Sequence, residues 1–309
     1  MSPKMKAVRY LGPGHIEITE TARPAPRKDE ALVEIRAVGI CNQSDTRTYN
    51  NVRATYPLAP GDPGCEAAGV VIEVGDEMTD VKPGDRVVMT GRRMYAEFCT
   101  RRAHEMAPLP AGVDIVEAAA LPTAGCLIAA ARRAGSLGER SVIVTGLGAA
   151  GLFAVQWAKI EKADEIIGFD IRPDRFEAAR RFGASTAAAA NDRALLTRFR
   201  EKPADVGIDC SGNPQAVSIL YTTCSTIVAF GVLSEPVKLE VPASRLVTLF
   251  NGHLGDEERQ AGLREAVRLF VEGKLLTKPI ITDVMKLEDY GLAMQRVRRG
   301  EVTKVVLVP

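Results

Sequence analysis

The sequence has few of the features that mark a disulfide-built, membrane-bound or nucleic-acid-binding protein. Its six cysteines include no CxxC pair, which argues against a disulfide framework and against a four-cysteine structural zinc site. The formal net charge is +1, so no excess of one sign points to nucleic acid or an anionic membrane. No apolar run approaches the ~20 residues of a membrane span, and "MSPKMKAVRY" lacks the apolar core of a signal peptide. We therefore expect a cytoplasmic protein that acts on a small molecule.

The pattern of predicted secondary structure along the chain changes near residue 120. Before that point, turns rich in Gly and Pro separate short β-rich runs such as "ALVEIRAVGI", "GVVIEVG" and "DRVVMT". These runs predict a compact β-barrel or sandwich. After that point strands and helices alternate, as in "SVIVTG", "GLFAVQWAKIEKA" and "EIIGFD", which predicts a parallel sheet with right-handed crossovers. A length of 309 residues also favours two domains over one.

The segment "SVIVTGLGAAG" is a predicted strand that runs into a GxGxxG motif. Gly146 permits the tight turn, Gly148 lets a pyrophosphate approach the backbone, and Gly151 lets the helix pack closely on the strand. The helix then begins around Ala149 and Ala150, where free N–H groups and the helix dipole favour phosphate. The strand, turn and helix together predict a dinucleotide-binding site.

A second strand, "EIIGFD", ends in Asp170, which lies 19 residues after Gly151. At this spacing an acidic residue accepts hydrogen bonds from the adenosine ribose hydroxyls. Because a carboxylate repels a 2′-phosphate, the sequence favours NAD(H) over NADP(H), a preference that Arg172 and Arg175 weaken. Ile171 and Arg175 complete the predicted cofactor-binding residues.

These segments, in this order, resemble the medium-chain dehydrogenase/reductase superfamily, which holds zinc alcohol, polyol and sugar dehydrogenases and their zinc-free relatives. "ALVEIRAVGICNQSD" resembles the strand and turn that carry the first catalytic zinc ligand, and "PGCEAAGVVIEVGDEMTDVKPGDRVV" resembles the Gly-His-Glu segment that follows. The resemblance implies an α/β protein with an N-terminal GroES-like β-barrel domain, a Rossmann domain with a doubly wound parallel sheet, and an active-site cleft between them. It places residues 1–122 plus 253–309 in the GroES-like catalytic domain, to which the C-terminal segment "VRRGEVTKVVLVP" returns, and residues 123–252 in the Rossmann domain. The lobe that carries the family's structural zinc is absent, because "GDRVVMT" runs almost directly into "YAEFCT".

The resemblance also identifies the candidate metal ligands. Cys41 matches the first zinc ligand, Cys65 stands where the family has its histidine ligand, and Glu66 matches the neighbouring glutamate. A catalytic zinc needs three protein ligands and one open position. The chain has three histidines, which we interpret as ordinary polar residues rather than substitute ligands: His15, His104 and His253.

The third zinc ligand of the family is a Cys, Glu or Asp about two dozen residues before Gly146. This chain has Leu121 and Pro122 there, which have no donor atom, and Cys126 is the nearby substitute. We therefore favour an enzyme without catalytic zinc. The alternative is an altered site made from the two cysteines and glutamate named above, with or without Cys126. Cys65 and Cys126 as small buried hydrophobic residues are compatible with the metal-free interpretation.

Other candidate residues also follow from the resemblance. Ser44 matches the hydroxyl that hydrogen-bonds the substrate oxygen, and Arg47 stands where zinc alcohol dehydrogenases often have a proton-relay histidine. Lys304 matches a basic residue that reaches the cofactor pyrophosphate. The alternatives are a solvated turn around Ser44 and a solvent-facing lysine at 304. The predicted catalytic set is Cys41, Ser44, Asp45, Arg47 and Glu66.

The sequence thus predicts an NAD(H)-dependent enzyme that interconverts an alcohol and a carbonyl on a small polar substrate. A zinc-free reductase of C=C or C=N bonds and a catalytically silent NAD-binding protein remain as alternatives, because a fold alone does not separate them. We expect a homodimer joined through the edge of the Rossmann sheet, with the apolar segment "CSTIVAFGVL" as the edge strand.

Overall fold

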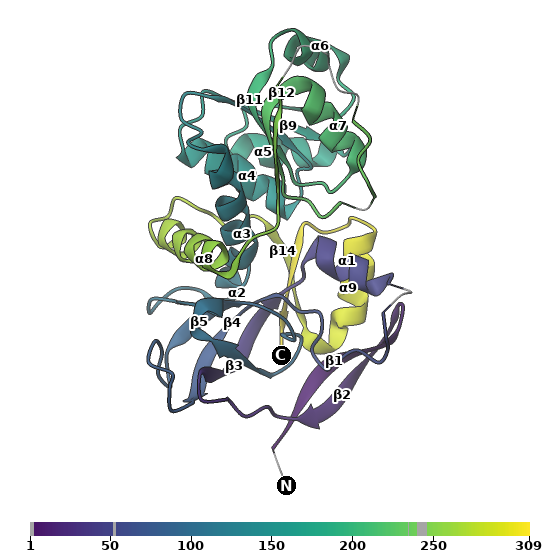
Figure 1. Ribbon diagram of the computed structural model, residues 1–309. Helices are drawn as coiled ribbons and strands as arrows, with labels where there is room; N and C mark the ends of the chain where they lie inside the picture. The colour runs from purple at the N-terminus through teal and green to yellow at the C-terminus, as the bar shows by residue number, and fades with distance from the viewer. Residues whose placement is uncertain (1–2, 52–53, 234, 240–245) are drawn as a thin grey trace. The chain divides into compact units, whose positions relative to one another are not determined.

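The computed structural model describes residues 3–51, 54–233, 235–239 and 246–309 (Figure 1). The chain divides into two compact units: the first is Met1–Gly125 with Arg259–Pro309, and the second is Cys126–Glu258. The division after residue 125 falls inside α3 (Leu121–Ala131), and the division after residue 258 falls inside α8 (Asp256–Val271). Met1 and Ser2, which begin the segment inspected for a signal peptide, lie outside the described residues.

The first unit is built mainly from β-strands, as its frequent turns predict. β1 (Lys4–Gly12) and β2 (His15–Ala22) form an antiparallel hairpin. A seven-stranded sheet has the order β14-β15-β3-β4-β5-β7, with β6 paired to β3. Its strands are β3 (Glu30–Gly39), β4 (Glu66–Val74), β5 (Arg86–Thr90), β6 (Phe98–Arg102), β7 (Met106–Pro108), β14 (Ile281–Lys286) and β15 (Lys304–Val308). Since β15 pairs with β3, the C-terminal segment returns to this sheet as expected.

The described helices of the first unit are short apart from α8. They are α1 (Asn42–Tyr49), α2 (Ile115–Ala118) and α9 (Tyr290–Arg298), with 3₁₀ turns at Ala103–Glu105 and Leu287–Asp289. The segment around Ser44, for which a solvated turn was the alternative, is the helix α1. The Asp45 carboxylate stabilises the start of this helix by accepting a hydrogen bond from the backbone N–H of Cys41, 2.9 Å away.

The second unit contains a six-stranded, fully parallel sheet with the order β10-β9-β8-β11-β12-β13. Numbered within the unit this order is 3-2-1-4-5-6, which is the Rossmann order. The strands are β8 (Ser141–Thr145), β9 (Glu165–Asp170), β10 (Thr186–Ala189), β11 (Ala204–Asp209), β12 (Cys224–Ala229) and β13 (Thr248–Asn251). The segment expected at the sheet edge is β12, but β13 pairs with its outer side, so β13 is the edge strand. β13 has only four residues, so the sequence gives little sign of this pairing.

Helices connect the strands of this sheet. They are α4 (Ala149–Ile160), α5 (Phe176–Phe182), α6 (Arg193–Glu201) and α7 (Pro214–Thr223), with 3₁₀ turns at Arg132–Ala134 and Pro173–Arg175. α4 contacts α5 and α6 contacts α7. In Figure 1 α4 and α7 flank the strands from opposite sides, so the sheet is doubly wound.

One stretch of the structure corrects an expectation about apolar runs. The helical stretch Ile115–Ala134 is 20 residues long and apolar enough to cross a membrane by length and composition. Within it, 67% of the apolar window is buried inside the protein, which is typical of a core helix.

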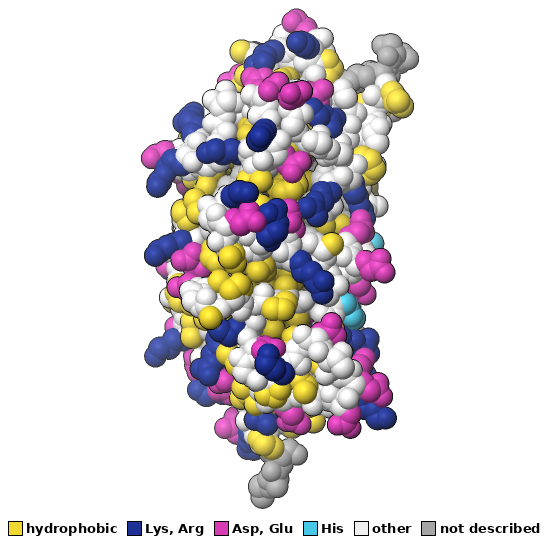
Figure 2. Space-filling model, turned by 90° about the vertical axis from the view of Figure 1, so that its left-hand side faces the viewer, with side chains coloured by type: hydrophobic (Ala, Val, Ile, Leu, Met, Phe, Trp, Pro, Cys, Tyr) yellow, Lys and Arg dark blue, Asp and Glu magenta, His cyan; other side chains and the backbone are white. Residues whose placement is uncertain are grey.

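On the face shown in Figure 2, basic and acidic side chains are interspersed rather than gathered by sign.

Candidate functional site

Two cysteines and a glutamate form a candidate metal site in the first unit. Cys41 precedes α1, Cys65 directly precedes β4, and Glu66 is the first residue of β4. The donor atoms of the three residues all lie within 4.8 Å of one another. Both cysteines are partly exposed, whereas Glu66 is buried. The alternative that Cys65 is a small buried hydrophobic residue is therefore wrong.

The two thiols differ sharply in acidity. A hydrogen bond from Cys65 lowers the pKa of the Cys41 thiol to about 7, against the opposing effect of burial. The same hydrogen bond, together with burial, raises the pKa of Cys65 well above its usual value. Near neutral pH the pair thus favours a Cys41 thiolate that accepts a hydrogen bond from the Cys65 thiol. A thiolate is the form of cysteine that binds metal or acts as a nucleophile.

Glu66 lies in a buried polar cluster that includes Lys304. The Lys304 amine donates to Glu66 Oε2 at 2.7 Å, and the Thr123 hydroxyl donates to the same oxygen at 2.6 Å. Lys304 is 1% exposed. Burial lowers the pKa of Lys304, but the negative charges of Glu66 and Cys41 and the hydrogen bond to Glu66 outweigh this and leave it raised. The solvent-facing alternative for Lys304 is therefore wrong, and its contact with a cofactor pyrophosphate stays a prediction.

The second oxygen of Glu66, Oε1, is buried and has no hydrogen-bond partner among the described residues. A buried carboxylate oxygen without a partner is costly, and a cation would satisfy it. The two sulfurs and a carboxylate oxygen of Glu66, all within 4.8 Å of one another, are three donors of the kinds that bind zinc. The structure therefore fits a metal site made from Cys41, Cys65 and Glu66.

Thr123 is the residue that the sequence analysis missed. It lies 23 residues before Gly146, within the same "about two dozen" spacing that directed attention to Leu121 and Pro122. Its hydroxyl holds Glu66 Oε2, and Lys304 lies 3.3 Å from it. Extending the search by one residue, to 23 residues before Gly146, would have found this oxygen donor from the sequence.

Asp45 lies beneath the cluster and holds it in place. Its carboxylate is fully buried and accepts hydrogen bonds from the Cys41 backbone N–H and from the Tyr95 hydroxyl. Burial and the nearby charge of Cys41 raise the pKa of Asp45 well above its usual value. Asp45 is thus a buried anchor for Cys41, rather than the exposed acid that the sequence allowed.

Ser44 has its hydroxyl at the edge of the same cluster. It lies 3.6 Å from Cys65 Sγ and 3.4 Å from Asp45 Oδ1. The side chain is partly exposed, so a bound substrate has access to it. Arg47, three residues further along α1, is exposed and makes no hydrogen bond or ion pair within the described parts of the chain.

The other predicted substitutes do not join this cluster. Cys126 belongs to the second unit, where it packs against Ala129 and other apolar residues but stays partly exposed, so it is not the buried hydrophobic residue of the alternative either. The metal-donor cluster found among residues 3–51, 54–233, 235–239 and 246–309 contains no histidine. His15 is exposed in the β1–β2 hairpin, as predicted.

The glycine motif of the second unit has the geometry that its sequence predicts. Gly146 has φ +82°, and a Cβ there would lie 2.8 Å from the Ser211 side chain. A Cβ on Gly151 would lie 1.8 Å from the Gly146 carbonyl oxygen, so α4 packs against the turn only with glycine at 151. At Gly148 the nearest atom to such a Cβ is Arg175 Nη1 at 3.6 Å, which leaves the loop more open there. α4 begins at Ala149, and Ala150 is its second residue.

Asp170 closes the motif at the carboxyl end of β9. Its carboxylate accepts hydrogen bonds from the Leu147 N–H at 2.6 Å, the Arg172 N–H at 2.9 Å and Arg175 Nη1 at 3.3 Å. A carboxylate offers about four acceptor positions, so one remains for a ribose hydroxyl. Arg172 directs its guanidinium to Asp174 instead, and Ile171 is 85% exposed. The structure thus places Asp170, Ile171 and Arg175 around one end of the glycine loop.

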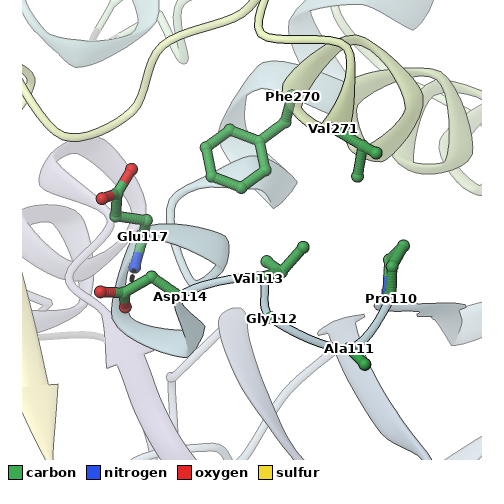
Figure 3. A pocket seen from close by; sticks show the side chains of 8 residues that line it. All are labelled: Pro110, Ala111, Gly112, Val113, Asp114, Glu117, Phe270 and Val271. Carbon is green, nitrogen blue, oxygen red and sulfur yellow. Dashed lines mark hydrogen bonds between the residues drawn. The ribbon is translucent and has the colours of Figure 1, made fainter.

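A separate depression lies outside this set of residues (Figure 3). Phe270 and Val271 extend into it from the end of α8, opposite the turn that precedes α2. The Asp114 carboxylate there caps α2, and Glu117 accepts a hydrogen bond from the buried Thr277 hydroxyl. Its polar groups are thus occupied by the fold, and no predicted catalytic or cofactor residue lines it.

Comparison with known families assigns both units. The family described as "Alcohol dehydrogenase GroES-like domain" matches residues 27–143, and the family described as "Zinc-binding dehydrogenase" matches residues 149–266. Together the two matches cover well over half of the chain.

Individual relatives extend over the whole length. An S-(hydroxymethyl)glutathione dehydrogenase of Escherichia coli O1:K1 / APEC is 26% identical over 374 aligned positions, covering 98% of this chain and 99% of that protein. Since the chain has 309 residues, at least 65 aligned positions of that relative have no counterpart in it.

Solved structures show the same fold. A protein of Sinorhizobium meliloti 1021 assigned to the zinc-binding dehydrogenases and bound to NADP has a TM-score of 0.85 at 20% identity, covering 100% of both chains. A protein of Escherichia coli CFT073 described as a short chain alcohol dehydrogenase and complexed with NADH has a TM-score of 0.85 at 21% identity, covering 99% of both.

The family is NAD(P)-binding, and its members are dehydrogenases and other oxidoreductases. Both family matches, the Rossmann strand order and the glycine motif agree with the resemblance found in the sequence. The chain is an oxidoreductase that belongs to the medium-chain dehydrogenase/reductase superfamily.

Proposed function

We propose that the protein is an NAD(H)-dependent dehydrogenase that interconverts an alcohol and a carbonyl on a small polar substrate. The observation that carries this proposal is the gathering of Cys41, Ser44, Cys65 and Glu66 in one partly exposed cluster of the first unit. A reductase of C=C bonds has no need of a sulfur and carboxylate cluster of this kind. The names of the matched families and of the curated relative, all alcohol-type or zinc-binding dehydrogenases, support the same chemistry.

Asp170 supports NAD(H) as the cofactor. One of its acceptor positions is free, and a 2′-phosphate at that place would meet a buried negative charge. Arg172 offers little compensation because its guanidinium is bound to Asp174. The solved relatives hold NADP in one case and NADH in the other, so the preference rests on this chain's own residues.

The cofactor preference is tested by fluorescence titration of the purified chain with NADH and NADPH. We expect NADH to bind at least about tenfold more tightly, which corresponds to ~1.4 kcal/mol. Asp170→Asn should shrink the difference, whereas Asp174→Asn, which removes the ion pair of Arg172 without changing Asp170, should improve NADPH binding. Equal affinities in the unsubstituted chain would overturn the assignment.

We further propose that Cys41, Cys65 and Glu66 hold a zinc ion, although the sequence favoured a metal-free enzyme. The unpartnered Glu66 Oε1 supports this, and the Lys304 ammonium offsets one of the three negative charges that two thiolates and a carboxylate would place around the metal. A bound zinc would supply Lewis-acid polarisation of the substrate oxygen.

The chain's own residues have separate tasks in this proposal. Ser44 orients the substrate oxygen by a hydrogen bond, because its hydroxyl is partly exposed beside Cys65. Asp45 fixes the backbone of Cys41. Lys304 and Thr123 hold one oxygen of Glu66, and the other has no hydrogen-bond partner among the described residues. The reduced cofactor supplies the hydride, so the protein contributes position and electrostatics.

Metal content and turnover of the same preparation test the site. We expect about one zinc per chain, lost together with activity in a chelator and restored by added zinc. Cys65→Ser should lower zinc content, whereas Ser44→Ala should lower turnover and leave zinc content unchanged. If the purified chain holds less than about a tenth of an equivalent of zinc and keeps full activity in chelator, the zinc proposal is wrong and the enzyme works without metal.

A further inference from the structure

Cys41 and Cys65 form a pair of sulfurs that has chemistry of its own. Their sulfur atoms lie within 4.8 Å of each other. Both are partly exposed, whereas three of the other cysteines, Cys99, Cys210 and Cys224, are buried. A histidine at position 65 would have given the cluster one sulfur, so Cys65 is what makes a dithiol here.

The backbones on both sides of this pair are held by the same neighbours. Asp45 accepts a hydrogen bond from the Cys41 N–H and another from the Tyr95 hydroxyl. A Cβ on Gly64, the residue before Cys65, would lie 2.6 Å from the Tyr95 backbone nitrogen, so this segment is tightly packed against Tyr95. The backbone at Cys41 and the backbone next to Cys65 are therefore both held by contacts that lead to Tyr95, one of them through Asp45.

A disulfide needs sulfurs about 2.05 Å apart, so the sulfurs would have to approach by less than about 3 Å. Rotation about the Cα–Cβ bonds moves a sulfur over such a distance without moving the backbone. The partial exposure of both side chains leaves room for this rotation and for a small oxidant.

We propose that Cys41 and Cys65 are a redox-active dithiol that hydroperoxides convert to a disulfide when no metal occupies the cluster. The Cys41 thiolate attacks one peroxide oxygen, an S–O bond forms, the O–O bond breaks, and the leaving oxygen departs as hydroxide or alkoxide and takes a proton. The Cys65 sulfur then attacks the Cys41 sulfur, the S–S bond forms, the S–O bond breaks, and water leaves with the Cys65 proton. Two electrons pass from the two thiols to one peroxide, and a dithiol reductant reverses the change.

The inference rests on the proposed function in one respect: zinc and peroxide would compete for the same two sulfurs. A metal held by both thiolates removes them from reaction. Zinc at 100 times its dissociation constant would slow the cross-link about 100-fold, because only ~1% of the chains would be free of metal. The site would then lose its metal-binding capacity under peroxide only after the metal has left.

The test uses the full chain, reduced, freed of metal by a chelator and then treated with hydrogen peroxide. We expect the loss of two free thiols per chain, a peptide pair linked through Cys41 and Cys65 in a non-reducing digest, and full recovery with dithiothreitol. Cys65→His, which keeps a metal donor and removes the second sulfur, should bind zinc but give no linked peptide. Cys126→Ala, a partly exposed cysteine in the other unit, is the matched control and should leave the cross-link unchanged.

Other outcomes overturn the proposal. Conversion of Cys41 to a sulfinic acid while Cys65 stays a free thiol, a cross-link between Cys41 and a different cysteine, or no reaction with peroxide would each show that the two residues are not a working pair. The dehydrogenase assay is run separately on the reduced protein. If the cross-link forms but no alcohol is oxidised, the dithiol stands and the proposed function fails; the reverse result removes the dithiol alone.

Discussion

At the scale of single residues, Lys304 has the environment least expected from its place in the sequence. It stands at the start of an apolar C-terminal strand, where half of the positions face solvent in an ordinary antiparallel sheet. In the structure its amine is buried against Glu66 and Thr123. A buried ion pair of this kind contributes little net stability, but the loss of one partner leaves the other charge uncompensated.

Lys304→Met should therefore destabilise the first unit by roughly 3–5 kcal/mol. The double variant Lys304→Met/Glu66→Gln should recover most of this loss because no buried charge remains. Five of the six tyrosines lie in the first unit, so tyrosine near-ultraviolet circular dichroism during urea unfolding measures the change. A double variant no more stable than Lys304→Met would contradict the ion-pair account.

The same pair predicts a pH dependence. The pKa of Lys304 is raised in the folded chain, so the stability it contributes is fully present below the unfolded value of about 10.4. That contribution falls as pH rises through the folded pKa. Wild type should thus lose stability above about pH 10.4 relative to the double variant, in parallel urea titrations, and the two should follow the same course from neutral pH up to that point.

Gly151 and Gly148 form a matched pair within the nucleotide motif. Gly151→Ala places a methyl group 1.8 Å from the Gly146 carbonyl oxygen, so α4 must shift and the second unit should lose about 1–3 kcal/mol. Gly148→Ala meets its nearest atom at 3.6 Å and should leave stability almost unchanged while weakening NADH binding. Thermal unfolding and NADH titration of both variants check this, and equal destabilisation by the two substitutions would count against the packing argument.

At the scale of secondary-structure elements, the edge of the Rossmann sheet decides how the chain could assemble. β13 pairs with β12 on one side, and its other side has no described partner strand. Leu249, in the middle of β13, is 49% exposed. An exposed edge strand with an apolar side chain is a hazard unless something covers it.

We predict a homodimer in which β13, rather than β12, lies at the interface between two copies. Leu249→Glu should shift the protein toward monomer by at least about tenfold in dissociation constant, or ~1.4 kcal/mol. Leu292→Glu, a similarly exposed leucine on α9 of the first unit, is the control and should not change assembly. Sedimentation at several concentrations measures this, and a wild-type chain that stays monomeric throughout would exclude the dimer.

At the scale of the whole molecule, each proposed ligand belongs to a different unit. The metal cluster lies in the first unit, and the glycine motif and Asp170 lie in the second. The chain has one tryptophan, Trp157 on α4, which is buried in the second unit. Tryptophan fluorescence therefore reports the unfolding of the second unit alone.

NAD⁺ at 100 times its dissociation constant should stabilise the second unit by about 2.7 kcal/mol and delay the fluorescence transition of Trp157. Zinc should instead delay the tyrosine dichroism transition of the first unit. Urea unfolding followed by both probes, with each ligand alone, tests this assignment. If zinc delays the Trp157 transition as much as the dichroism transition, the two units unfold together, and the two probes do not distinguish the unit that binds each ligand.

The sequence by itself determined the elements whose chemistry is local. GxGxxG requires glycine at 146 and 151 because a turn and a helix meet there, and Asp170 follows at a spacing that one strand–helix–strand unit imposes. The change from short strands to alternating strands and helices likewise follows from hydrophobic periodicity, so both domain types were predictable.

The tertiary structure alone decided the contacts between residues far apart in the chain. Glu66 meets Thr123 and Lys304 across separations of 57 and 238 residues, β13 covers β12 after a long connection, and Asp45 is buried by Tyr95. Such contacts depend on which surfaces pack together in three dimensions, and no local pattern of side chains encodes that choice.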